Sequence, residues 1–163
     1  MLSLNEQGHS FLLKHKSLLS KAADRLAIRE LIEAYAHCAD RRNLIGQMSL
    51  FTANARFAVH MNATDPTPAV DSYSREALAP VFADLKQYQA ITHFVGPNTL
   101  FTLTDDTGMG EAYCLAYYVR LNDNAQRLIV SSFRYLDSYV KLDGEWLFAE
   151  RRLYIDSQEE RAL

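Results

Sequence analysis

The second half of the chain alternates apolar and polar residues through long segments joined by short turns, and this pattern limits the possible folds most strongly. Successive side chains of a strand point to opposite faces, so alternation of this kind predicts strands with one buried face. Asp143-Gly144 is a typical residue pair for a tight hairpin, which lets consecutive strands pair antiparallel. We predict four strands, at about 91–104, 109–121, 126–142 and 145–156.

The first half of the chain places its apolar residues at helical spacing instead. The clearest pattern covers residues 22–42, and shorter helices are expected at 10–20 and 43–51. Ser74 can cap a further helix, in which Pro80 predicts a kink or a late start. Helices followed by a meander indicate an α+β fold. In such a fold the helices pack on one face of a curved, largely antiparallel sheet and enclose a pocket open at one end.

The length of 163 residues predicts a single domain. We expect this domain to cover residues 21–157, with a partly helical N-terminal extension over 1–20 and a C-terminal tail over 158–163. Residues 55–61 alternate as one further strand. Residues 62–73 contain two prolines and show no periodicity, which predicts a loop.

Composition and charge exclude several classes of partner. The formal net charge is −3 with scattered basic residues, so we expect no nucleic-acid partner. No apolar run is long enough to span a membrane, and the first residues are too polar for a signal peptide. Cys38 and Cys114 form no CxxC motif, which favours reduced cysteines in the core and a cytoplasmic location.

His93 is the first candidate for chemistry, because it lies near the start of a mostly apolar strand, ITHFVGPNTL. A buried imidazole costs free energy unless both ring nitrogens find partners. The ring therefore either meets a polar partner inside the fold or points to water. The rest of the sequence supplies a candidate for that partner.

Several stretches resemble the SnoaL-like branch of the nuclear transport factor 2-like superfamily over about residues 20–157. They are YAHCAD, LFTANARF, THFVGPNTLF, GEAYCLAYY and the final SSFRYLDSYVKLDGEWLFAERRLYID. The most distinctive positions in the last stretch are Tyr135, Asp137, Trp146 and Arg151. The resemblance implies the cone-shaped α+β fold of that superfamily.

Within the superfamily the pattern is similar to cofactor-free lyases such as scytalone dehydratase, bile acid 7α-dehydratase and hexachlorocyclohexane dehydrochlorinase. This likeness implies that Asp40, at the end of the long helix, supports His93 as a catalytic pair. It also implies that Tyr35 acts as an auxiliary acid and that Arg151 holds an anion. The chain departs from scytalone dehydratase, which uses a second catalytic histidine on a later strand, because no histidine follows His93.

An imidazole held by a carboxylate is a directed general base, and it can return the proton once charged. The other interpretation of Asp40 and His93 is a hydrogen-bonded pair in the core without chemistry. Tyr35 has a similar alternative as a helix aromatic facing the sheet. Arg151 follows Trp146 by five residues, so a regular strand points the two side chains to opposite faces. Arg151 therefore either faces inward, as an anion holder, or forms a salt bridge on the outer face.

Aromatic residues make up 11% of the chain, which suits a pocket for a flat apolar ligand as well as an aromatic core. We expect Tyr113, Tyr117 and Phe133 to wall the pocket and Asn98 to orient a substrate. A metal site is not expected, since His37-x-x-Asp40 has no third ligand at a suitable spacing.

The function expected from these residues is a dehydratase-type elimination on a small hydrophobic ring compound, aromatic or steroid-like, without a cofactor. An isomerase and a C–C lyase that releases an aldehyde use the same base and stay open. A different class also stays open: a non-catalytic binding protein or the small subunit of a ring-hydroxylating dioxygenase. We expect a homo-oligomer, a dimer or trimer.

Overall fold

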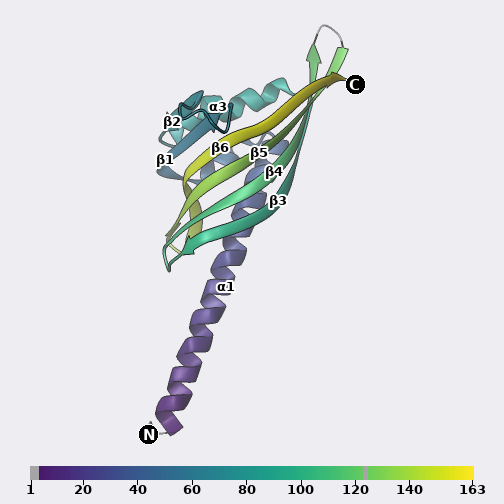
Figure 1. The fold of residues 1–163 in the computed structure, drawn as a ribbon. Helices are drawn as coiled ribbons and strands as arrows, with labels where there is room; N and C mark the ends of the chain where they lie inside the picture. The colour runs from purple at the N-terminus through teal and green to yellow at the C-terminus, as the bar shows by residue number, and fades with distance from the viewer. Residues whose placement is uncertain (1–3, 123–124) are drawn as a thin grey trace.

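The computed structural model describes residues 4–122 and 125–163, and it shows a curved six-stranded sheet with helices on one side (Figure 1). The strand order is β2-β1-β6-β5-β4-β3, and every neighbouring pair is antiparallel except β1 and β6. This arrangement confirms the α+β cone fold. The elements are α1 (Leu4–Asp40), α2 (Leu44–Ser49), β1 (Phe51–His60), β2 (Val70–Tyr73), η1 (Glu76–Leu78), α3 (Ala79–Ala83), η2 (Asp84–Gln87), β3 (Ala90–Leu103), β4 (Thr107–Asn122), β5 (Ala125–Leu142) and β6 (Glu145–Ala162).

The N-terminal residues form one continuous helix instead of the two expected ones. No glycine or proline separates 10–20 from 22–42, so nothing in the sequence ends the first helix. The C-terminal part of α1 packs on the sheet through Ile28, Ile32 and Tyr35, which are buried at helical spacing. Its N-terminal part extends beyond the sheet (Figure 1).

The segment between β1 and β3 differs most from the expectation. Part of the expected loop forms β2, which pairs antiparallel with β1. The helix after Ser74 is broken into a 3₁₀ turn, the short α3 and a second 3₁₀ turn. Pro80 lies in the first turn of α3, where a missing backbone N–H costs no hydrogen bond. Pro80 therefore delays the helix start, one of its two expected effects.

The four long strands lie close to their expected positions, but β6 continues to Ala162. Ala162 pairs with Arg127 of β5, and Arg120 of β4 binds Glu160 at 2.8 Å. Most of the expected tail over 158–163 is therefore strand, because β5 is long enough to pair with it.

The core lies between the helices and the concave face of the sheet, and it is rich in aromatic rings. The Tyr35 ring meets those of Phe51, Phe82 and Phe148 edge to face, at centroid distances of 5.9 to 6.0 Å. This packing leaves little empty space inside the cone. Among the described helices, none combines the length and the apolar character that crossing a membrane requires.

Candidate active site

Asp40 and His93 are in contact in the structure, as the family resemblance implied. Asp40 is the last residue of α1, and His93 lies near the start of β3. Asp40 Oδ1 is 2.6 Å from His93 Nδ1. The His93 side chain is 4% exposed and that of Asp40 24% exposed. The imidazole is therefore buried with a carboxylate partner on one ring nitrogen.

The same carboxylate also holds the backbone of β3. The His93 amide donates to Asp40 Oδ1 at 3.0 Å and to Oδ2 at 3.2 Å. β3 is an edge strand, so this amide has no neighbouring strand as a partner, and Asp40 supplies the missing acceptor. With a carboxylate on Nδ1, the favoured tautomer carries its proton there and leaves a lone pair on Nε2.

His93 lines a small, partly open cavity of about 140 Å³. The cavity lies between the end of α1, the α3 region and the concave face of the sheet. Its walls are mostly apolar, with phenol and amide groups at a few points. The lining residues are Tyr35, Ala39, Gln47, Phe57, Val59, Val81, Phe82, Leu85, His93, Tyr118, Tyr135 and Leu153.

Tyr118 is a functional candidate that the sequence reasoning missed. Its hydroxyl lies 3.3 Å from His93 Nε2, and its ring meets the imidazole edge to face at 5.7 Å. The available signal was strand parity: Ala112, Cys114 and Ala116 form a row of small buried residues, and Tyr118 continues that row.

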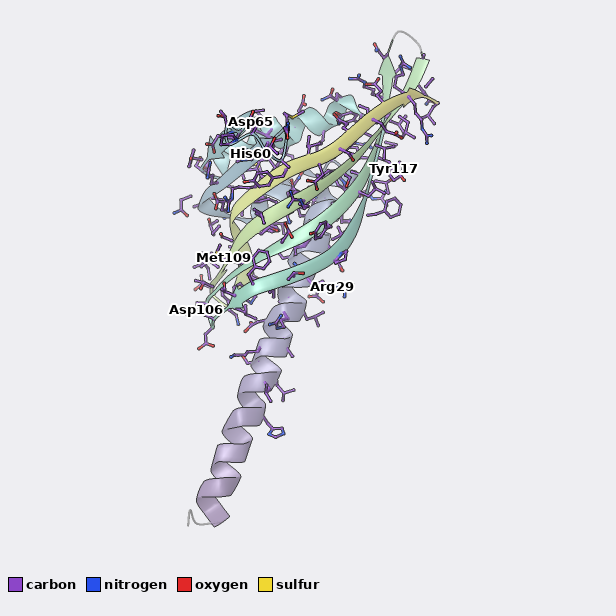
Figure 2. All side chains as sticks on the ribbon, in the orientation of Figure 1. Arg29, His60, Asp65, Asp106, Met109 and Tyr117 are labelled. Carbon is purple, nitrogen blue, oxygen red and sulfur yellow. The ribbon has the colours of Figure 1, made fainter. Side chains whose placement is uncertain are left out.

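Tyr113 and Tyr117 do not wall the cavity, which corrects the expectation for them. They have the opposite parity to Tyr118, so they lie on the outer face of β4. Tyr113 is 45% exposed, and the Tyr117 ring packs on that of Phe94. Figure 2 shows Tyr117 on the outside of the sheet. Alternation along a strand puts both tyrosines on the same face, but it does not say which face turns inward.

Phe133 and Asn98 lie apart from each other. Phe133 is buried, and its ring contacts the rings of His93 and Tyr135 at 6.0 and 5.3 Å. It supports the imidazole from the core without lining the cavity.

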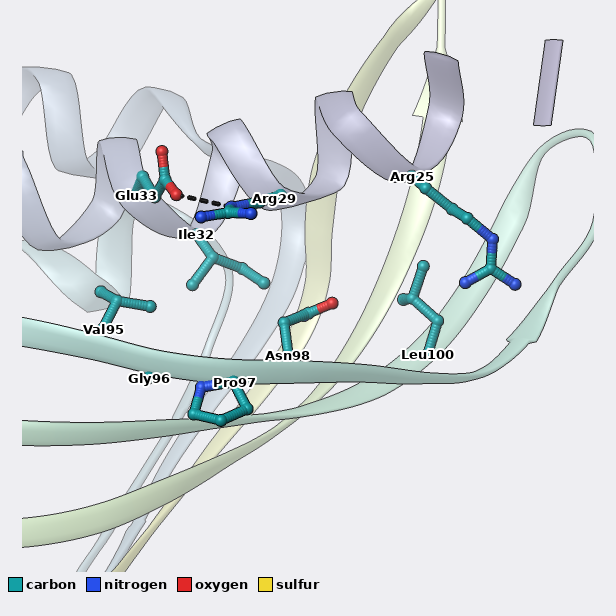
Figure 3. Close-up of a pocket in the computed structure, with 9 residues that line it drawn as sticks. All are labelled: Arg25, Arg29, Ile32, Glu33, Val95, Gly96, Pro97, Asn98 and Leu100. Atoms are coloured by element: carbon teal, nitrogen blue, oxygen red, sulfur yellow. Dashed lines mark hydrogen bonds and ion pairs between the residues drawn. The ribbon is translucent and has the colours of Figure 1, made fainter. Parts of the chain in front are cut away.

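Asn98 lies on β3 farther along the strand and lines a separate crevice between α1 and β3 (Figure 3).

Arg151 faces inward, but it is enclosed. Its Nε and Nη2 donate to the two oxygens of Asp137, each at 2.8 Å, and both side chains are 0% exposed. The guanidinium carbon lies 4.3, 3.8 and 4.0 Å from the ring centroids of Tyr35, Tyr135 and Phe148. Arg151 is absent from the cavity wall.

Trp146 is buried as well, so it and Arg151 do not point to opposite faces. The pairing of β5 and β6 explains this. Ser138 pairs with Glu150, but the next residue, Tyr139, pairs with Phe148. The register shift leaves one extra residue in β6 and reverses the parity between Trp146 and Arg151.

The phenols around the cavity are held in their protonated form. Burial raises the pKa of Tyr35 to about 12, although the nearby Arg151 charge opposes the shift. Burial also raises the pKa of Tyr118 and of Tyr135 well above the ordinary value. These hydroxyls are suited to donating hydrogen bonds and poorly suited to releasing protons.

The arrangement can perform proton transfer at one position. Nε2 of His93 is the basic atom at the cavity wall, and Tyr118 supplies a hydroxyl beside it. Within residues 4–122 and 125–163 no three His, Cys, Asp or Glu side chains are placed to share a metal ion.

Solved structures of other proteins share this fold. A candidate scytalone dehydratase from Novosphingobium aromaticivorans is 15% identical and superposes with a TM-score of 0.73 over 88% of this chain and 91% of its own. The hexachlorocyclohexane dehydrochlorinase LinA-type3 from Novosphingobium barchaimii is 18% identical, with a TM-score of 0.69 over 88% and 93%. The beta subunit of a candidate aromatic-ring-hydroxylating dioxygenase from N. aromaticivorans is 22% identical, with a TM-score of 0.70 over 84% and 92%.

The sequence matches no curated protein. The model of the SnoaL-like domain family matches residues 20–152, which is most of the chain and includes both Asp40 and His93. The protein therefore belongs to the SnoaL-like domain family.

Proposed function

We propose that the protein is a cofactor-independent lyase in which His93 is the general base and Asp40 its positioning partner. One observation carries the proposal: Asp40 holds Nδ1 at 2.6 Å, the Tyr118 hydroxyl lies beside Nε2, and both His93 and Tyr118 line the same cavity.

The reaction that these groups support is an elimination. His93 Nε2 takes a proton from a carbon next to an electron-withdrawing group, and the released electron pair forms a carbon–carbon double bond. The bond to a hydroxyl on the adjacent carbon breaks at the same time or afterwards. The imidazolium returns its proton to the departing hydroxide, so that water leaves and His93 is neutral again. The Asp40 carboxylate stabilises the imidazolium between these two steps.

Tyr118, and not Tyr35, is the hydroxyl that assists the base His93. In the free protein the Tyr118 hydroxyl is hydrogen-bonded to Nε2 of His93, and a substrate would replace it there. Because burial raises the pKa of Tyr118, it donates a hydrogen bond to a substrate oxygen and keeps its proton. Tyr35 lines the same cavity and also keeps its proton, while Arg151 supports the rings from behind.

The cavity limits the size of the substrate. A cavity of roughly 150 Å³ with apolar walls holds one benzene molecule. The cavity here is about 140 Å³, which suits a single six-membered ring. We therefore propose that one ring of the substrate, aromatic or partly reduced, occupies the cavity during the reaction.

The same base also serves an isomerase, which returns the proton to a different carbon, or a C–C lyase, which takes a hydroxyl proton and releases an aldehyde. The second class of function is a binding protein or a dioxygenase small subunit. Its support is the likeness to the dioxygenase beta subunit, at 22% identity. Such a protein has no need of a base at a cavity wall.

We further propose a cytoplasmic homo-oligomer. Cys38 and Cys114 are buried and unpaired, as expected in a reducing compartment. Phe94, Tyr113 and Leu115 expose apolar surface on the outer face of the sheet, where a second copy can cover it.

The test is a turnover screen of hydroxylated monocyclic compounds. Turnover is measured as the increase in ultraviolet absorbance when the new double bond forms. We expect His93→Ala to lose at least about 10²-fold in turnover, since a general base contributes about that much or more. His60→Ala is the matched control. His60 is also buried, but it stacks on Tyr154 and bonds a backbone carbonyl, with no carboxylate partner.

Equal turnover by wild type and His93→Ala would remove His93 from the mechanism. Equal losses in His93→Ala and His60→Ala would show that any buried histidine is needed for folding alone. Compounds that bind the wild type without turnover would favour the binding class.

A further inference from the structure

A crevice on the outside of the domain is separate from the cavity beside His93. It lies between α1 and β3 and has a volume of about 450 Å³ (Figure 3). Ligand sites in proteins commonly span roughly 300 to 1,000 Å³. The crevice and the internal cavity share no lining residue. The mechanism above leaves this crevice without a role.

A bulge in β3 shapes the strand side of the crevice. Val95 pairs with Cys114 and Asn98 with Ala112, so β3 carries one extra residue at Gly96-Pro97. Pro97 has no backbone N–H, and β3 is the edge of the sheet. This strand edge is therefore a poor template for an added peptide strand. The geometry favours a small molecule as the occupant.

The helix side of the crevice carries excess positive charge. Arg25 and Arg29 lie one turn apart on α1 and both line the crevice. Arg29 binds Glu33 at 2.8 Å, whereas Arg25 has no ion pair within the part of the chain that the structure describes. The strand side, residues 95–100, has no charged residue. One guanidinium is thus left to bind an anion.

The floor of the crevice is apolar with one polar group. Val95 and Leu100 from the strand form the apolar part, over the buried Ile32 of the helix. Asn98 lies between them, and its amide oxygen points into the space between helix and strand (Figure 3). The crevice therefore offers an apolar surface, one acceptor and one unpaired cation to the same bound molecule.

We propose that this crevice binds a small organic anion, a carboxylate carried on an apolar ring. The carboxylate lies against the Arg25 guanidinium, whose planar donors match two carboxylate oxygens. The ring covers Val95 and Leu100. This site stands apart from the lyase proposal and does not depend on His93.

The test measures binding of 2-naphthoate and of its neutral analogue 2-naphthamide, by calorimetry and by amide chemical shifts in NMR spectra. We expect the wild type to bind the naphthoate about tenfold more tightly than the amide, with the shifts gathered at Val95–Leu100. Arg25→Gln should weaken naphthoate binding about tenfold and leave the amide unchanged. Arg127→Gln, an equal charge change at a half-exposed position on β5, should change neither.

Three results would each overturn the proposal. One is equal affinity of wild type and Arg25→Gln for the naphthoate. Another is a set of shifts at His93 and Tyr118, which would place the ligand in the internal cavity. The last is no binding up to the solubility limit of the probe. His93→Ala should bind the naphthoate as the wild type does, so failure of the lyase proposal leaves this test intact.

Discussion

Asp137 and Asp40 each bind a basic side chain, and their surroundings differ. Asp137 and Arg151 are 0% exposed and lie beneath aromatic rings, where burial lowers the pKa of Arg151 but Asp137 outweighs that effect and the net shift is upward. Asp40 is 24% exposed, and its partner His93 lines a cavity with its second nitrogen beside the Tyr118 hydroxyl.

The difference separates structure from chemistry. An enclosed guanidinium with a permanent charge can hold strands and rings together, but it has no proton to exchange near neutral pH. An imidazole whose other nitrogen is reachable can take and return a proton. Resemblance alone marked Asp40, His93 and Arg151 alike as site residues, and their surroundings tell them apart.

The largest effect is expected from breaking the enclosed pair. Asp137→Ala leaves the Arg151 charge buried without a carboxylate, which should lower the free energy of unfolding by about 3–5 kcal/mol. Urea unfolding followed by circular dichroism measures this change. The matched control is the double variant Asp137→Leu with Arg151→Met, which removes both charges and should cost far less. A loss below about 1 kcal/mol in the single variant would show that the enclosed pair does not stabilise the fold.

The second-largest effect is expected at the pair of Asp40 and His93, where activity and not stability should change. Asp40→Asn keeps an acceptor for the His93 amide but cannot stabilise an imidazolium. We expect turnover to fall about 10²-fold or more while the free energy of unfolding changes by about 1 kcal/mol or less. Turnover on the best compound of the screen and urea unfolding are measured on the same preparation. Unchanged turnover with a large loss of stability would make this pair structural, like Asp137 and Arg151.

The smallest effect concerns the phenol of Tyr35, which contacts Arg151 and lines the cavity with His93. The pKa of Tyr35 is raised to about 12 in the folded protein, so the unfolded phenol ionises first, near pH 10. The stability that its buried proton confers is complete below pH 10 and is lost as the pH rises toward 12. This group alone removes about 1.4 kcal/mol per pH unit in that window.

Tyr35→Phe should reduce the alkaline loss of stability by that amount, as measured by unfolding between pH 9 and 12. Phe51→Leu removes a neighbouring ring that does not titrate, so it should lower stability equally at every pH. Identical alkaline slopes in wild type and Tyr35→Phe would mean that the Tyr35 phenol ionises as easily inside the protein as in the unfolded chain.

The sequence by itself determined the α+β class and the positions of the four long strands, because periodicity depends only on local backbone geometry. Resemblance also pointed to Asp40 and His93, which the fold brings into contact. Their spacing of four residues along one strand also implies that Tyr113 and Tyr117 share a face.

Only the tertiary structure decided which parity faces the cavity. On β4 the tyrosine that faces the cavity is Tyr118. The register shift beside Phe148 points both Trp146 and Arg151 toward the core. The continuation of β6 to Ala162 likewise follows from its pairing with β5. Facing, register and the size of the remaining space depend on contacts between residues far apart in the chain. Those contacts form when helices and sheet pack together, and no local pattern contains them.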